Sequence, residues 1–280
     1  MWIWASVLSA VLLGLYDVAK KYALRRNGVL PVLFASTAIS TLLLSPFLSA
    51  GAPEDHLRLA FKAVLVSASW ISGLAALRHL PITTVSTIKG SRPVFVVLFS
   101  IVIFGERLAA LQWTGVILAL TAIFLAGGKG SSEVPAGDRR KGLPLMALSV
   151  ATGVASALYD KHIMRSLDPL FVQSWANLYI SVILGLCLLF TYIRNGSDSV
   201  KFRWDWALPV TALLITVADA LYFYALKEPG ALLSVVSTVR RASILVTFVA
   251  GALVFGEKNL RPKAAAMIMM AAGVALLVLS

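Results

Sequence analysis

Runs of about twenty apolar residues recur along the whole of this 280-residue chain. A helix of about twenty residues crosses the ~30 Å hydrocarbon layer of a bilayer, whereas a strand of a membrane β-barrel needs only about ten. The composition agrees, because 59% of the residues are hydrophobic and 14% are charged, against about half and about a quarter in soluble domains. We therefore predict an all-α integral membrane protein.

Turn-forming and charged residues separate the apolar runs, as at Asp168-Pro169 and Glu228-Pro229-Gly230. These breaks divide the chain into ten predicted transmembrane helices. The predicted spans are 2–24, 30–50, 58–79, 82–104, 109–127, 143–165, 169–193, 204–226, 230–255 and 262–279.

Short motifs recur in the same order in the two halves of the chain. Five predicted helices in each half require the second copy to cross the membrane in the opposite sense. The predicted organisation is therefore two inverted five-helix repeats, residues 1–127 and 143–280, joined by a linker over 128–142. The matching motifs are Leu15-Tyr16-Asp17 with Leu158-Tyr159-Asp160, Val85-Ser86-Thr87-Ile88-Lys89 with Val236-Ser237-Thr238-Val239-Arg240, and Phe104-Gly105-Glu106 with Phe255-Gly256-Glu257.

The formal net charge of +12 lies mostly in short loops next to apolar runs, such as Arg25-Arg26 and Arg139-Arg140-Lys141. Anionic lipids and the positive-inside rule account for this pattern, so we expect membrane lipids and a small-molecule substrate as partners and no nucleic acid. Loops after odd-numbered helices hold more Lys and Arg, which predicts that they are cytoplasmic. Short loops are typical of a bacterial inner (plasma) membrane protein, and we expect a monomer or a homodimer.

Four basic residues that lie well inside the spans 82–104 and 230–255 are the first candidates for substrate binding: Lys89, Arg92, Arg240 and Arg241. Inserting a charged side chain at the centre of a membrane helix costs ~2.5–3.5 kcal/mol. Charged residues at such positions therefore indicate a functional cavity. The alternative is that long side chains reach out to the membrane surface. Inverted repeats place Lys89 and Arg240 on opposite walls of one cavity, where they suit a phosphate or carboxylate group.

Hydroxyl-bearing residues near these bases are further candidates for substrate binding, although aromatic residues in membrane helices also serve as packing. They are Ser86, Ser237, Tyr16, Tyr159 and Tyr222.

Three acidic residues also lie well inside predicted spans: Asp17, Asp160 and Asp219. Asp17 can pair with Lys21 one turn later, and Lys161 follows Asp160 directly. Asp219 has no base within four residues, which makes it a candidate for proton coupling or amine binding. The alternative is that all three acids neutralise buried bases and hold helices together.

The two five-helix halves, each with a Phe-Gly-Glu turn after its fourth helix, resemble the EamA-type drug/metabolite transporter superfamily. Lys89 and the Arg240-Arg241 pair further resemble the Lys and the Lys-Arg pair with which triose-phosphate/phosphate translocators hold a phosphate group. Arg240 replaces a Lys of that pattern, and Arg92 has no counterpart in it. The resemblance implies a secondary transporter of a small anionic or zwitterionic metabolite, working by alternating access.

Other functions fit the sequence less well. The chain has no HExxH and no GxSxG motif, and its Tyr-Asp pairs lack the setting of intramembrane aspartyl proteases, so we expect no enzyme. No Walker loop occurs, and we expect no cofactor and no metal site. A lipid-headgroup flippase and a proton-coupled exporter of amino acids, amines or drugs remain as alternatives.

Overall fold

The computed structural model of this chain describes residues 1–80, 85, 88–126, 136–196, 202–255 and 261–280. Every regular element within these residues is helical, which confirms the all-α prediction. Helices of the first half are α1 (Trp2–Ala23), α2 (Val29–Leu44) with the short 3₁₀ helix η1 (Ser45–Phe47), α3 (Pro53–Ala76), α5 (Arg92–Phe104) and α6 (Ala110–Ala126). Helices of the second half are α7 (Ala136–Ile163), α8 (Pro169–Asn195), α9 (Ala207–Lys227), α10 (Leu233–Arg241), α11 (Ser243–Phe255) and α12 (Arg261–Leu279).

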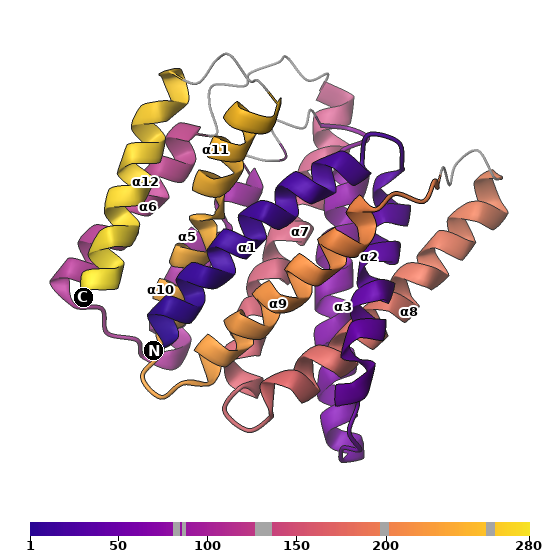
Figure 1. The fold of residues 1–280 in the computed structure, drawn as a ribbon, viewed down its shortest axis with the longest axis horizontal. Helices are drawn as coiled ribbons and strands as arrows, with labels where there is room; N and C mark the ends of the chain where they lie inside the picture. The colour runs from indigo at the N-terminus through magenta and orange to yellow at the C-terminus, as the bar shows by residue number, and fades with distance from the viewer. Residues whose placement is uncertain (81–84, 86–87, 127–135, 197–201, 256–260) are drawn as a thin grey trace.

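The helices run side by side and alternate in direction, so that both termini lie at the same end of the bundle (Figure 1). Seven helices of the described residues are long and apolar enough to cross a membrane, and shorter apolar helices cover 110–125 and 265–279. Large apolar side chains point away from the bundle, including Val102, Ile103 and Ile268, which are between 59% and 79% exposed. Such an outer surface is stable only against lipid, in agreement with an integral membrane protein.

Some helix boundaries differ from the sequence prediction. Helix α7 begins at Ala136, inside the stretch 128–142 that we predicted to be a linker. Residues 137–141 are exposed, so this first part of α7 extends beyond its apolar part. Hydropathy detects only the apolar part of a helix, which is why the prediction began the span at residue 143.

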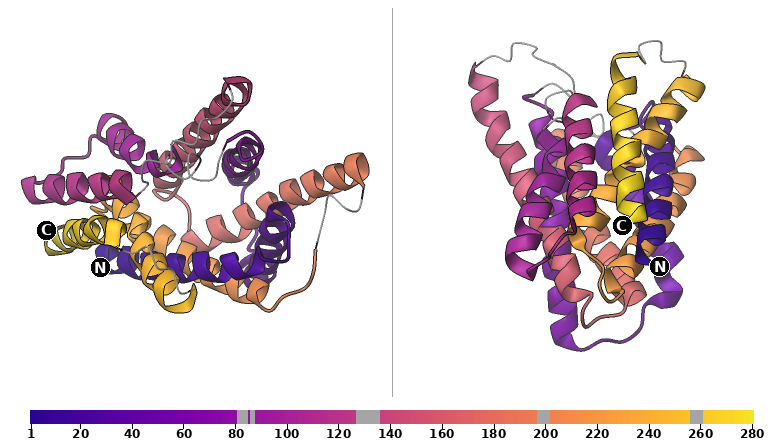
Figure 2. Two further views of the ribbon diagram at one scale, coloured as in Figure 1. Left: turned by 90° about the horizontal axis from the view of Figure 1, so that it is seen from above. Right: turned by 90° about the vertical axis from the view of Figure 1, so that its left-hand side faces the viewer.

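Most of the large interhelical contacts join the first half of the chain to the second. Helix α1 packs along α9 and α3 packs along α7, while α6 pairs with α12 and α2 with α8 (Figure 2). Buried hydroxyl groups support two of these contacts: Ser9 Oγ donates to the carbonyl of Ala218 at 2.7 Å, and Ser69 Oγ donates to that of Ser149 at 2.8 Å. The interior of the bundle is therefore lined by residues of both halves.

Two helices are interrupted at corresponding places. The helical residues before α5 end at Gly90, and the N–H of the next residue, Ser91, bonds to Ile88 O at 3.1 Å, three residues back. The same bond joins Ala242 N to Val239 O at 2.9 Å between α10 and α11. Ser91 and Ala242 are separated by 151 positions, the offset that also aligns Val85–Lys89 with Val236–Arg240 and Phe104–Glu106 with Phe255–Glu257. Broken helices at membrane depth are tolerated where they line a cavity, so these breaks mark the region of a site.

Candidate functional site

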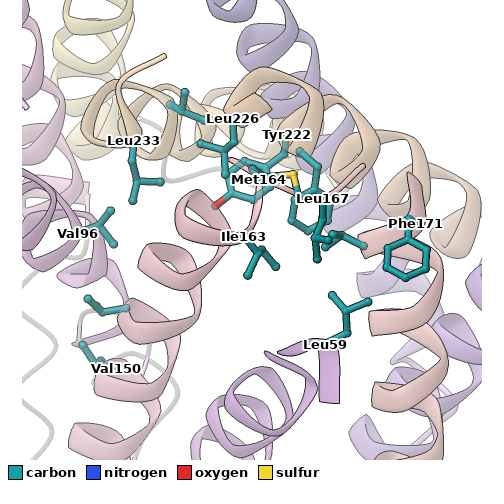
Figure 3. Packing of buried hydrophobic residues seen from close by; sticks show 14 residues of the cluster. Leu59, Val96, Val150, Ile163, Met164, Leu167, Phe171, Tyr222, Leu226 and Leu233 are labelled. Atoms are coloured by element: carbon teal, nitrogen blue, oxygen red, sulfur yellow. The ribbon is translucent and has the colours of Figure 1, made fainter. Parts of the chain in front are cut away.

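One end of the bundle is closed by an apolar core. Figure 3 shows Ile163, Met164 and Leu167, at the end of α7 and just after it, packed against Leu226 of α9 and Leu233 of α10. These five side chains are at most 9% exposed, so they form a closely packed apolar layer. Charged side chains support this core from its edge, because Lys161 Nζ donates to Ala231 O at 2.6 Å and Lys227 Nζ donates to Leu167 O at 2.8 Å.

The Phe-Gly-Glu turn of the first half is part of this closed end. Gly105 takes a left-handed conformation, with φ of 65°, and stops α5. The next residue, Glu106, is buried, and its carboxylate accepts hydrogen bonds from Leu233 N at 2.6 Å, Ser234 N at 3.1 Å and Ser234 Oγ at 2.5 Å. Because α10 has no capping side chain of its own, Glu106 caps a helix of the other half.

Two ion pairs lie next to each other in the middle of the bundle. Lys62 of α3 pairs with Asp160 of α7, and Arg240 of α10 pairs with Asp219 of α9. Tyr222 joins them, since its hydroxyl hydrogen-bonds Asp160 and its ring lies 4.3 Å below the Arg240 guanidinium carbon. We call these five residues the ion-pair pocket; its formal charge is balanced, with two cations and two carboxylates.

The ion-pair pocket surrounds a cavity of about 160 Å³ between α3, α7, α8, α9 and α10. Polar side chains complete its wall, namely Ser156, Asn177 and Gln173. The Gln173 side chain is buried, and its Nε2 donates a hydrogen bond to Thr216 O at 2.7 Å. Its Oε1 has no hydrogen-bond partner in the described part of the chain. The cavity therefore offers charged groups of both signs and an unused hydrogen-bond acceptor.

A second group of charged residues lies where α1, the break before α5, and α10 approach one another. The charge of Lys89 acts on those of Arg92, Lys20 and Arg241, and Asp17 faces Lys20 and Arg241. We call Lys20, Lys89, Arg92, Arg241 and Asp17 the basic cluster. Among the described residues of this cluster, four cations interact with one carboxylate, that of Asp17. The cluster thus carries an excess of positive charge, and Asp17 remains accessible.

Arg92 is held in the basic cluster by contacts to α3 and α7. One nitrogen of its guanidinium donates to Ser69 Oγ at 2.5 Å and to Ser149 O at 2.8 Å. The guanidinium lies against Gly153, where any side chain would overlap it. Arg92 Nε is buried without a hydrogen-bond acceptor among the described residues. Since Arg92 is also the first residue of α5, its positive charge adds to that of the helix N-terminus.

Helix α10 carries adjacent arginines into the two regions. Consecutive helical side chains point about 100° apart, so Arg240 pairs with Asp219 while the charge of Arg241 acts on that of Asp17. The sequence predicted that Lys89 and Arg240 face each other across one cavity. In the structure Lys89 interacts with Arg241, and Arg240 turns toward the ion-pair pocket.

Other predicted site residues take different places. Tyr159 lies outside the ion-pair pocket, with its ring against Phe61 and His162. Ser237 donates to Ser234 O of its own helix at 3.1 Å, and Tyr16 accepts a hydrogen bond from Lys20 Nζ at 3.1 Å. Ser86 lies outside the described residues.

Sequence reasoning missed Lys62, Lys20 and Gln173. Lys62 lies only four positions inside the predicted span 58–79, where a lysine is readily taken for one that reaches the surface. Its burial, with 3% exposure, removes that possibility. The available signal was that an acid inside an apolar span, Asp160, requires a basic partner, which another helix can supply as well as the adjacent Lys161.

Comparisons with known proteins agree with this architecture. The sequence model of the EamA-like transporter family matches residues 1–128 and 140–279. A protein of known crystal structure superposes with a TM-score of 0.76 over 99% of this chain and 95% of its own, at 15% sequence identity. That likeness concerns the fold alone. No curated protein matches the sequence.

Proposed function

Since this chain belongs to the EamA-like transporter family, we propose that it is a secondary transporter of a small anionic or zwitterionic metabolite that bears a phosphate or carboxylate group. The family is one of membrane transporters within the drug/metabolite superfamily. The substrate class and the mechanism are our proposal, and they rest on the two charged regions described above.

The excess of positive charge in the basic cluster carries this proposal. Four cations held close together in a membrane protein repel one another, and Asp17 compensates for only one of them. A bound phosphate or carboxylate relieves this repulsion and offers acceptors to Arg92 Nε and to the Lys89 ammonium. The broken helix adds to the attraction, because the N-terminus of α5 points its backbone N–H groups toward the break at Ser91.

The ion-pair pocket supports the zwitterionic form of the substrate. Asp160, Asp219 and the free acceptor of Gln173 line one cavity and suit an ammonium group. The same residues favour a second candidate function, export of amines or amino acids with coupling through Asp160 and Asp219. In that case the basic cluster neutralises charge and binds no substrate.

We further propose that transport proceeds by alternating access between two inverted repeats of five helices each. The breaks at Ser91 and Ala242 and the reciprocal pairings of α1 with α9 and of α3 with α7 support this arrangement. In this proposal the contacts of Glu106 with α10 act as the closed gate at one end of the bundle. Substrate release at that end requires these hydrogen bonds and the surrounding apolar core to separate. A bacterial inner membrane suits the short loops.

Ligand-dependent stability of the purified protein tests the proposal. Sugar phosphates, phosphonates, amino acids and quaternary amines are each added, and thermal unfolding in detergent is followed. A ligand at about 100 times its Kd stabilises the native state by ~2.7 kcal/mol, which is readily measured. We expect stabilisation by phosphate- or carboxylate-bearing compounds, and its loss in Arg241→Gln and Lys89→Gln.

Arg139→Gln is the matched control, because it removes an exposed arginine of α7 that lies in neither region. Stabilisation by amines alone, unchanged in Arg241→Gln, would overturn the anion proposal in favour of the amine exporter. Compounds that stabilise the protein are then tested for exchange across the membrane of proteoliposomes.

A further inference from the structure

Helix α8 changes its surroundings halfway along its length. Between Pro169 and Leu184 it has nine buried residues, whereas none of the residues 185–195 is buried. Figure 1 shows this second part of α8 leaning away from the rest of the bundle, and Figure 2 shows the same from above. Its side chains include Leu186, Phe190 and Ile193, which are 61% to 73% exposed. This part of the helix therefore presents an apolar surface to the bilayer.

A cavity of about 270 Å³ lies at the end of this exposed surface. It is lined by Arg78, just after α3, and by Phe190, Thr191, Arg194 and Asn195 of α8. Helix α8 starts in the closed apolar core at Pro169 and has 27 residues, so its far end lies ~40 Å away. That length exceeds the ~30 Å hydrocarbon layer and puts Arg194 at the level of the lipid headgroups.

The charge of this cavity is positive. Arg78 and Arg194 are both exposed, and neither pairs with a carboxylate among the described residues. The sequence also predicts that this end, which carries Arg25-Arg26 and Arg139-Arg140, is the cytoplasmic one. Anionic lipids concentrate in that leaflet and attract basic residues beside it.

We infer that this cavity binds an anionic phospholipid, which we call the α3–α8 lipid site. The two guanidinium groups hold the phosphate, the Asn195 amide offers a donor to the headgroup, and an acyl chain lies along Leu186 and Phe190. A free phosphate would use only the arginines and leave the apolar surface uncovered, so the adjoining surface favours a lipid. This site is independent of the proposed substrate and lies at the edge of the bundle.

Native mass spectrometry of the full-length protein tests the site. Delipidated protein is titrated with phosphatidylglycerol and with phosphatidylcholine of the same acyl chains. We expect tighter binding of phosphatidylglycerol, weakened about fivefold by either Arg78→Gln or Arg194→Gln and about thirtyfold by the double variant. Arg139→Gln/Arg140→Gln removes the same charge from the same end of the bundle and should bind as the wild type does.

Several outcomes overturn the inference. Equal affinity for the two lipids, or wild-type binding by the double variant, excludes an anionic-lipid site at these arginines. Displacement of the lipid by millimolar inorganic phosphate means that the cavity holds a free anion. A dimer of wild-type protein that dissociates in the double variant means that a second copy covers this surface. Arg78→Lys/Arg194→Lys keeps both positive charges and should retain the preference for phosphatidylglycerol. That result shows that the weaker binding of the double Gln variant comes from the lost charge and not from a loss of folding.

Discussion

The ion-pair pocket and the basic cluster both bring buried or half-buried charges into a membrane protein, but they treat these charges differently. In the ion-pair pocket every cation has a carboxylate partner, and Lys62 and Asp160 are almost fully buried. In the basic cluster four cations face one accessible carboxylate. A balanced group stabilises the fold by itself, whereas an unbalanced group is stable only with water or a bound anion. The comparison therefore distinguishes residues that hold helices together from residues that we propose bind the substrate.

The largest expected effect is on the buried pair Lys62–Asp160. Asp160→Asn leaves the buried Lys62 charged and without its carboxylate partner, at a cost of about 3–5 kcal/mol. Thermal unfolding of the purified variant should show a large loss of stability. The double variant Lys62→Met/Asp160→Leu should recover most of it, because no unpaired charge remains. Wild-type stability of Asp160→Asn would mean that this pair is hydrated, and the contrast between the regions would fail.

The second expected effect compares adjacent arginines of α10. Arg241→Gln removes a charge-assisted contact worth about 1.5–3 kcal/mol, so uptake of the anionic substrate by proteoliposomes should fall about tenfold to hundredfold. Its thermal stability without substrate should stay the same or rise, because like charges repel less. Arg240→Gln, with the same change one residue earlier, should lower stability by leaving Asp219 unpaired. Identical behaviour of the two variants would show that the regions act as one.

Glu106 connects the comparison to the gate, since it caps the helix that carries both arginines. Glu106→Gln removes the negative charge from the N-terminus of α10 and should cost about 1 kcal/mol. Hydrogen exchange of residues 231–237 should then speed up about fivefold. Glu54→Gln serves as control, because Glu54 is an exposed carboxylate in the first turn of α3. Unchanged exchange would mean that the apolar core alone closes this end.

The smallest expected effect is on the second ion pair. Arg240 and Asp219 side chains are 18% and 29% exposed, compared with 4% and 8% for Lys62 and Asp160. Water screens the more exposed pair, so Asp219→Asn should cost only about 0.2–1 kcal/mol of unfolding free energy. Thermal unfolding measured beside Asp160→Asn checks this order. An equal loss in the two variants would show that both pairs form one buried network.

Several features of the site followed from the sequence. Lys89, Arg92, Arg240 and Arg241 stood out because charged residues in apolar spans are expensive, and all four lie in the two charged regions. Tyr159 was predicted as a hydroxyl-bearing candidate for the site, and it directly precedes Asp160. Neighbouring residues of a helix point about 100° apart, however, so only one of the two faces the cavity.

The partners of these charges were not visible in the sequence. Local spacing offered Lys161 to Asp160 and no base to Asp219, whereas the structure supplies Lys62 from α3 and Arg240 from α10. The break at Ser91 has a local cause in Pro93, which has no N–H to donate. The equivalent break at Ala242 has no proline near it, and packing against other helices determines it.

The sequence by itself determined that this protein resides in a lipid bilayer, that it is helical, and that it carries energetically costly charges inside the membrane. These properties depend on composition and on periodicity along one segment, which hydropathy measures directly. Only the tertiary structure decided which charges neutralise one another, which remain unbalanced, and which end of the bundle is closed. Each of these depends on contacts such as Glu106 with Ser234, between residues more than a hundred positions apart, and no local pattern encodes such a contact.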